Sequence, residues 1–203
     1  MQSTLPVQLD TAGYGALHDP RTLPRSLAGR VLLAIAASGL VALCAHVSLP
    51  LYFTPVPLTL QTLAVVLIGF TLGPVLGFSA MLLYLAEGAM GLPVFSPHGP
   101  GGVAQLLGPT AGFLFSYPLA AAAAGGVVRA VRLGRSQFLG AGIAGVAASF
   151  FIFAMGAGWL AHWLHLGPRA AWHMAVAPFL PGEVLKVSAA AGIYSTLRRW
   201  RRS

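Results

Sequence analysis

Long apolar segments with almost no charged residues alternate along this chain with three clusters of arginine. Of its 203 residues, 57% are hydrophobic and only 8% are charged, and the mean hydropathy is +0.78. A soluble domain does not sustain such values, because its surface needs charged side chains. Since a helix crosses the hydrocarbon core with roughly 20 residues, the chain is predicted to be an all-α integral membrane protein.

Six apolar segments predict a bundle of six transmembrane helices. They cover residues 28–48, 58–72, 75–90, 106–128, 138–164 and 182–197. Residues 51–57 contain Pro55 and Pro57 and are expected to be irregular. The membrane domain is therefore predicted to span residues 28–203, including a basic C-terminal tail. Residues 1–27 are mixed and polar and are predicted to form a disordered cytoplasmic tail.

The arginines predict the orientation of the bundle. Ten of the twelve Lys and Arg residues fall into three clusters, which are Arg21, Arg25 and Arg30; Arg129, Arg132 and Arg135; and Arg198, Arg199, Arg201 and Arg202. By the positive-inside rule these clusters are cytoplasmic, so both termini are predicted to be cytoplasmic. The net charge of +8 then reflects membrane orientation, and no nucleic-acid partner is expected. Five crossings, with residues 58–72 only re-entrant, are the alternative.

An acidic and a basic residue stand one helical turn apart near the start of the last apolar segment. Glu183 and Lys186 lie in the sequence Pro-Gly-Glu-Val-Leu-Lys at 181–186. Ionisable groups at membrane depth are costly and mark candidate functional sites. Three residues apart in a helix, both side chains can face the same way. They are candidate ligand-binding groups, and the alternative is that they only neutralise each other.

Small residues form a stripe on one face of the first predicted helix. Ala34, Ser38 and Ala42 recur every four residues, a spacing that lets another helix approach closely in lipid. Two interpretations stay open, namely packing inside this chain and docking of a separate membrane subunit.

Four short motifs follow one another through about 135 residues. They read Pro-Val-Pro-Leu-Thr-Leu-Gln-Thr-Leu at 55–63, Gly-Leu-Pro-Val-Phe at 91–95, Gly-Pro-Thr-Ala-Gly-Phe at 108–113 and Pro-Phe-Leu-Pro-Gly-Glu-Val-Leu-Lys at 178–186. With these motifs the sequence resembles the BioY family, the biotin-specific substrate-capture subunits of energy-coupling-factor (ECF) transporters. Two positions depart from the family pattern, which more often has Gly-Asp in the last motif and Thr-Gly-Gly in the third.

The resemblance implies a multi-pass subunit of the bacterial cytoplasmic membrane that captures biotin with high affinity for uptake. The implied partners are the ECF transmembrane coupling protein, its ATPase subunits and the lipid bilayer. The sequence contains no phosphate-binding loop, so ATP is expected to be hydrolysed by the partner subunits alone. No enzymatic activity, cofactor or metal is expected of the chain, and self-association of the isolated protein stays open.

The residues expected to bind biotin lie at the outer end of the bundle. Lys186 is expected to bind an anionic or carbonyl group of biotin, and Glu183 to accept from its ureido N–H donors. Further contacts are predicted for Gln61, Thr59, Tyr84, Glu87 and Phe95. For Glu87 the alternative is a polar helix end, and for Phe95 it is a place in the aromatic belt at the membrane interface.

Three rival functions make different demands on the sequence. Another vitamin in place of biotin would need a similar pocket. A transition-metal importer would have to use His162, His165 and His173, which no cysteine or aspartate joins. An intramembrane enzyme would need a catalytic motif, and neither H-E-x-x-H nor G-x-S-x-G occurs in the chain.

Overall fold

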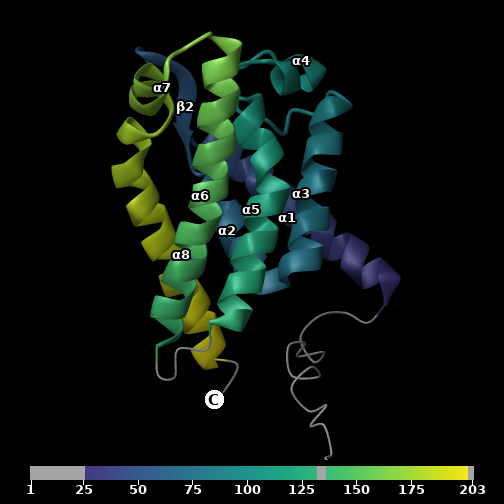
Figure 1. Ribbon diagram of the computed structural model, residues 1–203. Coiled ribbons are helices and arrows are strands. Elements are labelled where there is room, and N and C mark those ends of the chain that lie inside the picture. Colours follow the sequence, from purple (N-terminus) through teal and green to yellow (C-terminus); the bar gives the residue numbers. More distant parts are fainter. Residues whose placement is uncertain (1–25, 132–135, 201–203) are drawn as a thin grey trace, which may run out of the picture.

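The computed structural model describes residues 26–131 and 136–200, and most of these are helical (Figure 1). The longer helices are α1 (Leu27–His46), α2 (Gln61–Leu72), α3 (Pro74–Ala89), α5 (Ala111–Ala130), α6 (Gln137–Trp163) and α8 (Leu180–Trp200). Shorter elements are α4 (Gly102–Leu107), α7 (Pro168–Ala175) and the 3₁₀ turn η3 (Ala177–Phe179). The predicted N-terminal tail, up to residue 25, and residues 132–135 and 201–203 lie outside the described residues.

The predominantly helical architecture predicted from the sequence is confirmed. Within the described residues, four segments are long and apolar enough to cross a membrane: α1, α5, α6 and the stretch Pro168–Trp200 that ends with α8. Helices α2 and α3 are apolar but shorter, with 12 and 16 residues. Large apolar side chains such as Leu43, Phe150 and Leu185 are exposed on the outside of these helices, as expected of surfaces that face lipid.

A β-hairpin replaces the irregular segment expected after the first helix. Strand β1 (Ser48–Leu51) pairs antiparallel with β2 (Thr54–Thr59), with Ser48 opposite Thr59. The prediction was wrong because both strands of a two-stranded ribbon are edge strands, where prolines are tolerated. Since β2 continues to Thr59, α2 begins at Gln61 and not at residue 58.

The crossing expected over residues 106–128, beginning near Pro109, is formed by α5, and its first two residues belong to the separate short helix α4. Helix α4 ends at Leu107, and α5 begins at Ala111. Pro109 causes the break, because proline lacks an N–H and disfavours helical geometry in the residue before it. Helix α4, α7 and the hairpin lie at the same end of the bundle (Figure 1).

Helix α5 is the centre of the packing and contacts α2, α3 and α6, while α8 packs against α6 and α2. Glycines allow the closest of these approaches. A β-carbon at Gly69 of α2 would lie 2.5 Å from the carbonyl oxygen of Ala121, and one at Gly125 of α5 would lie 2.5 Å from the backbone of Gly73. In a lipid environment the hydrophobic effect does not drive helices together, so they associate through close packing at small residues.

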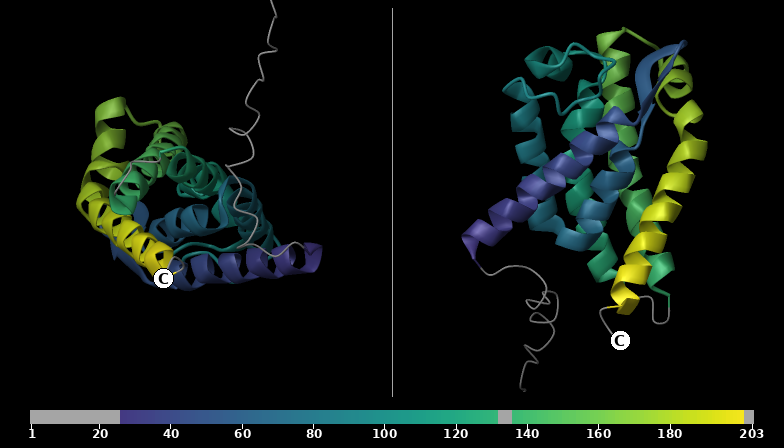
Figure 2. Two further views of the ribbon diagram at one scale, coloured as in Figure 1. Left: turned by 90° about the horizontal axis from the view of Figure 1, so that it is seen from below. Right: turned by 180° about the vertical axis from the view of Figure 1, so that it is seen from behind.

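Helix α1 crosses the other helices obliquely (Figure 2, right) and packs against α3 and α2. Its predicted docking stripe belongs to this internal contact: Ser38 is 1% exposed, Ala34 is buried and Ala42 is half-buried. Small side chains at these positions let α1 approach its neighbours within the chain. In this structure the stripe is therefore an internal packing face and not a free surface.

Candidate functional site

The charged pair lies in the first two turns of α8. Glu183 and Lys186 are 4% and 8% exposed, and the Lys186 Nζ lies 2.8 Å from the Glu183 Oε2. Pro181 fits the start of a helix because its missing N–H would have no partner there. A carboxylate in the first turn is favoured by the helix dipole. The local sequence thus places both charges side by side at the end of the bundle that carries the hairpin.

Hydroxyl groups from two other helices complete the surroundings of this pair. Thr62 of α2 donates to the Glu183 Oε2 at 2.9 Å, and Ser149 of α6 donates to the Glu183 Oε1 at 2.8 Å. The Lys186 ammonium donates to the Thr62 hydroxyl at 2.6 Å and to the Thr59 carbonyl oxygen at 3.3 Å. All three ammonium protons therefore have an acceptor, whereas the carboxylate oxygen Oε1 keeps a lone pair for a further donor.

A second polar network runs from the hairpin to the third helix. The Thr59 hydroxyl donates to the Gln61 Oε1 at 3.1 Å, and the Gln61 Nε2 donates to the Tyr84 hydroxyl at 2.7 Å. Tyr84 in turn donates to the carbonyl oxygen of Val94 at 2.9 Å. This chain of hydrogen bonds ties the start of α2 to the loop after α3 and fixes the orientation of the Gln61 amide.

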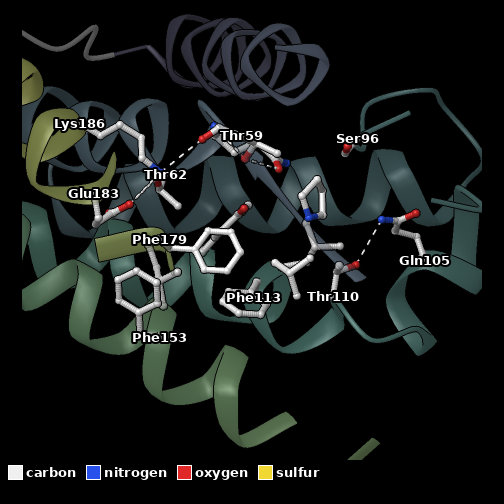
Figure 3. Close-up of a pocket in the computed structure, with 16 residues that line it drawn as sticks. Thr59, Thr62, Ser96, Gln105, Thr110, Phe113, Phe153, Phe179, Glu183 and Lys186 are labelled. Carbon is white, nitrogen blue, oxygen red and sulfur yellow. Dashed lines mark hydrogen bonds and ion pairs between the residues drawn. The ribbon is translucent and has the colours of Figure 1, made fainter. Parts of the chain in front are cut away.

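Both networks border one pocket (Figure 3), which residues of the hairpin and of α4 also line. Its empty volume is about 570 Å³, including space that opens to solvent, which is in the range of small-molecule sites. The lining residues are Val56, Pro57, Thr59, Gln61, Thr62, Ser96, Gln105, Thr110, Phe113, Leu114, Tyr117, Ile152, Phe153, Phe179, Glu183 and Lys186. Apolar and aromatic surface combined with placed polar groups, as here, is typical of a pocket for an organic ligand.

Sequence comparison assigns a family to this arrangement. Residues 18–203 match the model of the BioY family. The chain belongs to the BioY family.

BioY relatives align over most of their length. The biotin transporter BioY of Rhodobacter capsulatus is 36% identical over 181 residues, which cover 85% of this chain and 94% of that protein. A probable biotin transporter BioY of Pyrococcus horikoshii is 36% identical over 144 residues, covering 71% of this chain and 82% of that protein. Together with the four described segments that are long and apolar enough to cross a membrane, these relatives agree with the prediction of a multi-pass membrane protein.

A solved structure of a transporter component shares the fold. The crystal structure at 2.1 Å of the S-component for biotin from an ECF-type ABC transporter superposes with a TM-score of 0.75. The superposition covers 84% of this chain and 90% of the chain in the crystal structure, and the two sequences are 24% identical.

The residues predicted from the resemblance to the BioY family divide into two groups. Lys186, Glu183, Gln61 and Thr59 line the pocket. The other three do not line it, and they lie as follows: Tyr84 is completely buried behind Gln61, Phe95 packs edge-on against Tyr84 with ring centroids 5.4 Å apart, and Glu87 is half-buried on α3. Phe95 occupies that place because Gly88 has no side chain, and a β-carbon there would collide with the Phe95 ring.

Several residues of the pocket and of the polar network behind it were missed by sequence reasoning. Ser149 stands in the middle of the long apolar helix α6, so a polar group at membrane depth was a usable signal. Thr62 stands out in the first family motif as a hydrogen-bonding group, but the motif alone does not show that the side chain reaches α8. Gln105 and Phe153 carry no such signal, because their place in the pocket depends on how α4 and α6 pack.

The metal alternative finds no support in the described part of the chain, where no three His, Cys, Asp or Glu side chains gather into a group that could hold a metal ion.

Proposed function

We propose that this chain is the substrate-specific subunit of an ECF-type transporter and that it captures biotin for uptake. The observation that carries the proposal is the buried Glu183–Lys186 pair on the wall of a pocket that also has an aromatic and aliphatic surface. Family membership supports the same conclusion, since the relatives of comparable length are named as biotin transporters and not as enzymes.

The pair suits the ureido ring of biotin, which has two N–H donors and a carbonyl acceptor. The Oε1 atom of Glu183 keeps a lone pair that can accept from a ureido N–H group. The longest hydrogen bond of the Lys186 ammonium is the one to the Thr59 carbonyl oxygen, at 3.3 Å. Lys186 can give up this bond and donate to the ureido carbonyl instead. The apolar thiophane ring would lie against Phe113, Phe153 or Phe179, which border the same space (Figure 3).

We also propose six membrane crossings, by α1, α2, α3, α5, α6 and α8, with both termini in the cytoplasm. At about 1.5 Å per residue α2 and α3 are shorter than the hydrocarbon core, and the hairpin and the loop after α3 complete their side of the bundle. Arg129, which donates to the carbonyl oxygen of Leu72, and Arg198, which stacks on Tyr194, mark the opposite end. That end would face the cytoplasm under the positive-inside rule.

The energy for uptake would come from partner subunits. We propose a transmembrane coupling protein and ATPase subunits as the partners in the bacterial cytoplasmic membrane, because the chain's own sequence has no phosphate-binding loop. The chain itself would need no cofactor.

Equilibrium binding of labelled biotin to the detergent-purified chain tests the proposal. The matched variants are Lys186→Met and Arg169→Met, since Arg169 is an exposed cation on α7 that does not line the pocket. Tight binding by the unaltered chain and by Arg169→Met, with loss in Lys186→Met, is expected. Equal binding by both variants, or no binding by the unaltered chain, would contradict the proposal.

A further inference from the structure

The pocket has a second polar end, which is formed by uncharged side chains. Ser96, Gln105 and Thr110 lie across the pocket from Glu183 and Lys186, with aromatic rings between the two groups (Figure 3). They come from the loop after α3, from α4 and from the residue before α5. The pocket therefore presents polar groups at both ends and apolar surface in the middle.

Ser96 is the most informative member of this second end. The residue is 6% exposed, it lines the pocket, and the Ser96 Oγ has no hydrogen-bond partner within the described structure. A buried hydroxyl without a partner costs free energy, and most such groups in folded proteins are paired. A ligand atom in the pocket would supply the missing partner.

Gln105 holds the neighbouring hydroxyl in place. Its Oε1 accepts from the backbone N–H of Gly101 at 3.2 Å, and its Nε2 donates to the Thr110 Oγ1 at 3.2 Å. Because the Thr110 oxygen accepts this bond, its own proton is left to donate elsewhere. Gln105 is thus a positioning residue, and Thr110 and Ser96 supply the hydroxyls that this end of the pocket offers to a ligand.

The two ends differ in what they can recognise. Among the described residues that line the pocket, only Glu183 and Lys186 are charged, and they already neutralise each other. A ligand group with both donors and an acceptor fits that end. Hydroxyl donors without a cation fit a terminal acceptor group, whether it is an ionised carboxylate or a neutral carbonyl.

We propose that Ser96 and Thr110 form a subsite for the carboxyl end of the ligand, so that biotin spans the pocket with its ureido ring at Glu183 and Lys186. This inference rests on the proposed function. Because no cation among the described lining residues stands at the carboxyl end, the negative charge of the ligand contributes little to binding. The substrate class then extends to biotin whose carboxyl group is esterified or amidated.

The test compares three ligands on the unaltered chain: biotin, biotin methyl ester and an analogue whose side chain ends in a methyl group. The ester is expected to bind within about tenfold of biotin, since its carbonyl still accepts a hydrogen bond. The methyl-ended analogue is expected to bind about ten- to a hundredfold more weakly, the effect of losing hydrogen bonds to a buried group. A loss for the ester on the order of a hundredfold or more would show that a cation holds the carboxylate and would overturn the proposal.

A double variant locates the subsite. Ser96→Ala with Thr110→Val is expected to lower biotin affinity to that of the methyl-ended analogue and to bind both ligands alike. The control is Ser195→Ala with Thr71→Val, whose hydroxyls donate within their own helices and do not line the pocket. The control should bind as the unaltered chain does.

The outcomes separate this inference from the proposed function. If the unaltered chain does not bind biotin, the proposed function fails. If it binds biotin and the folded pocket variant keeps full affinity, the subsite alone is refuted. If thermal unfolding shows that the pocket variant does not fold, the comparison of ester and acid on the unaltered chain decides.

Discussion

The hydroxyl of Thr62 lies 2.6 Å from the ammonium of Lys186, although 124 residues separate the two in sequence. The same hydroxyl donates to Glu183 at 2.9 Å, so one side chain of α2 contacts both charges of α8. A threonine is suited to this position because its hydroxyl donates and accepts at once. Through this contact the motif at residues 55–63 positions the charged pair in the motif at residues 178–186.

Replacing Thr62 by valine is expected to weaken biotin binding by about tenfold. The change keeps the shape of the side chain but removes its hydrogen bonds to Glu183 and Lys186. A hydrogen bond to a charged group contributes about 1.5–3 kcal/mol. Equilibrium binding measures the effect. Thr71→Val is the control, because the Thr71 hydroxyl donates to the backbone of its own helix. Unchanged affinity in Thr62→Val would show that the pair needs no support from α2.

The stability of the protein without biotin is expected to show that the charges depend on each other. Glu183→Gln should lower the free energy of unfolding by about 3–5 kcal/mol, because it leaves the Lys186 ammonium buried without its counter-charge. Adding Lys186→Met to this variant should recover much of the lost free energy of unfolding, because neither charge of the pair then remains buried. Thermal unfolding in detergent compares the single and double variants. A double variant less stable than both singles would contradict this coupling.

The same variants distinguish pairing from ligand binding. The double variant Glu183→Gln with Lys186→Met is expected to be folded but not to bind biotin, because both charged contacts to the ureido ring are gone. Full biotin affinity in this variant would show that the pair serves packing alone.

The sequence allowed the helical segments and one end of the site to be predicted, because apolar length and buried charge are local signals. The Glu183–Lys186 pair follows from a spacing of three residues in one helix. The hairpin was not predictable from Pro55 and Pro57, because their effect depends on whether a second strand lies beside them. Ser96 and Gln105 were missed for a related reason: they lie in the pocket only because the segment before Pro109 folds over the bundle.

The packing of α2 against α5 predicts opposite effects for two glycine substitutions. Gly69→Ala is expected to destabilise the protein by about 1–3 kcal/mol, because the new methyl group would lie 2.5 Å from the carbonyl oxygen of Ala121 and would overpack the contact. Gly126→Ala has open space around its β-carbon and should be neutral or stabilising by up to about 1 kcal/mol, since alanine favours the helix. Thermal unfolding decides. Equal effects of the two changes would refute the close contact.

The proposed orientation predicts that both ends of the chain are reached from the same side of the membrane. The experiment starts from Cys44→Ala, which removes the one native cysteine of the chain. Ser3→Cys and Ser203→Cys are then made separately in this background, and each new cysteine is labelled with a membrane-impermeant maleimide. Neither should react in intact cells, and both should react after the membrane is opened, because an even number of crossings returns the chain to the cytoplasm. Labelling of one cysteine but not the other in intact cells would require an odd number, as expected if α2 enters the membrane without crossing it. The result therefore tests whether a helix of 12 residues, completed by a hairpin, serves as a full crossing.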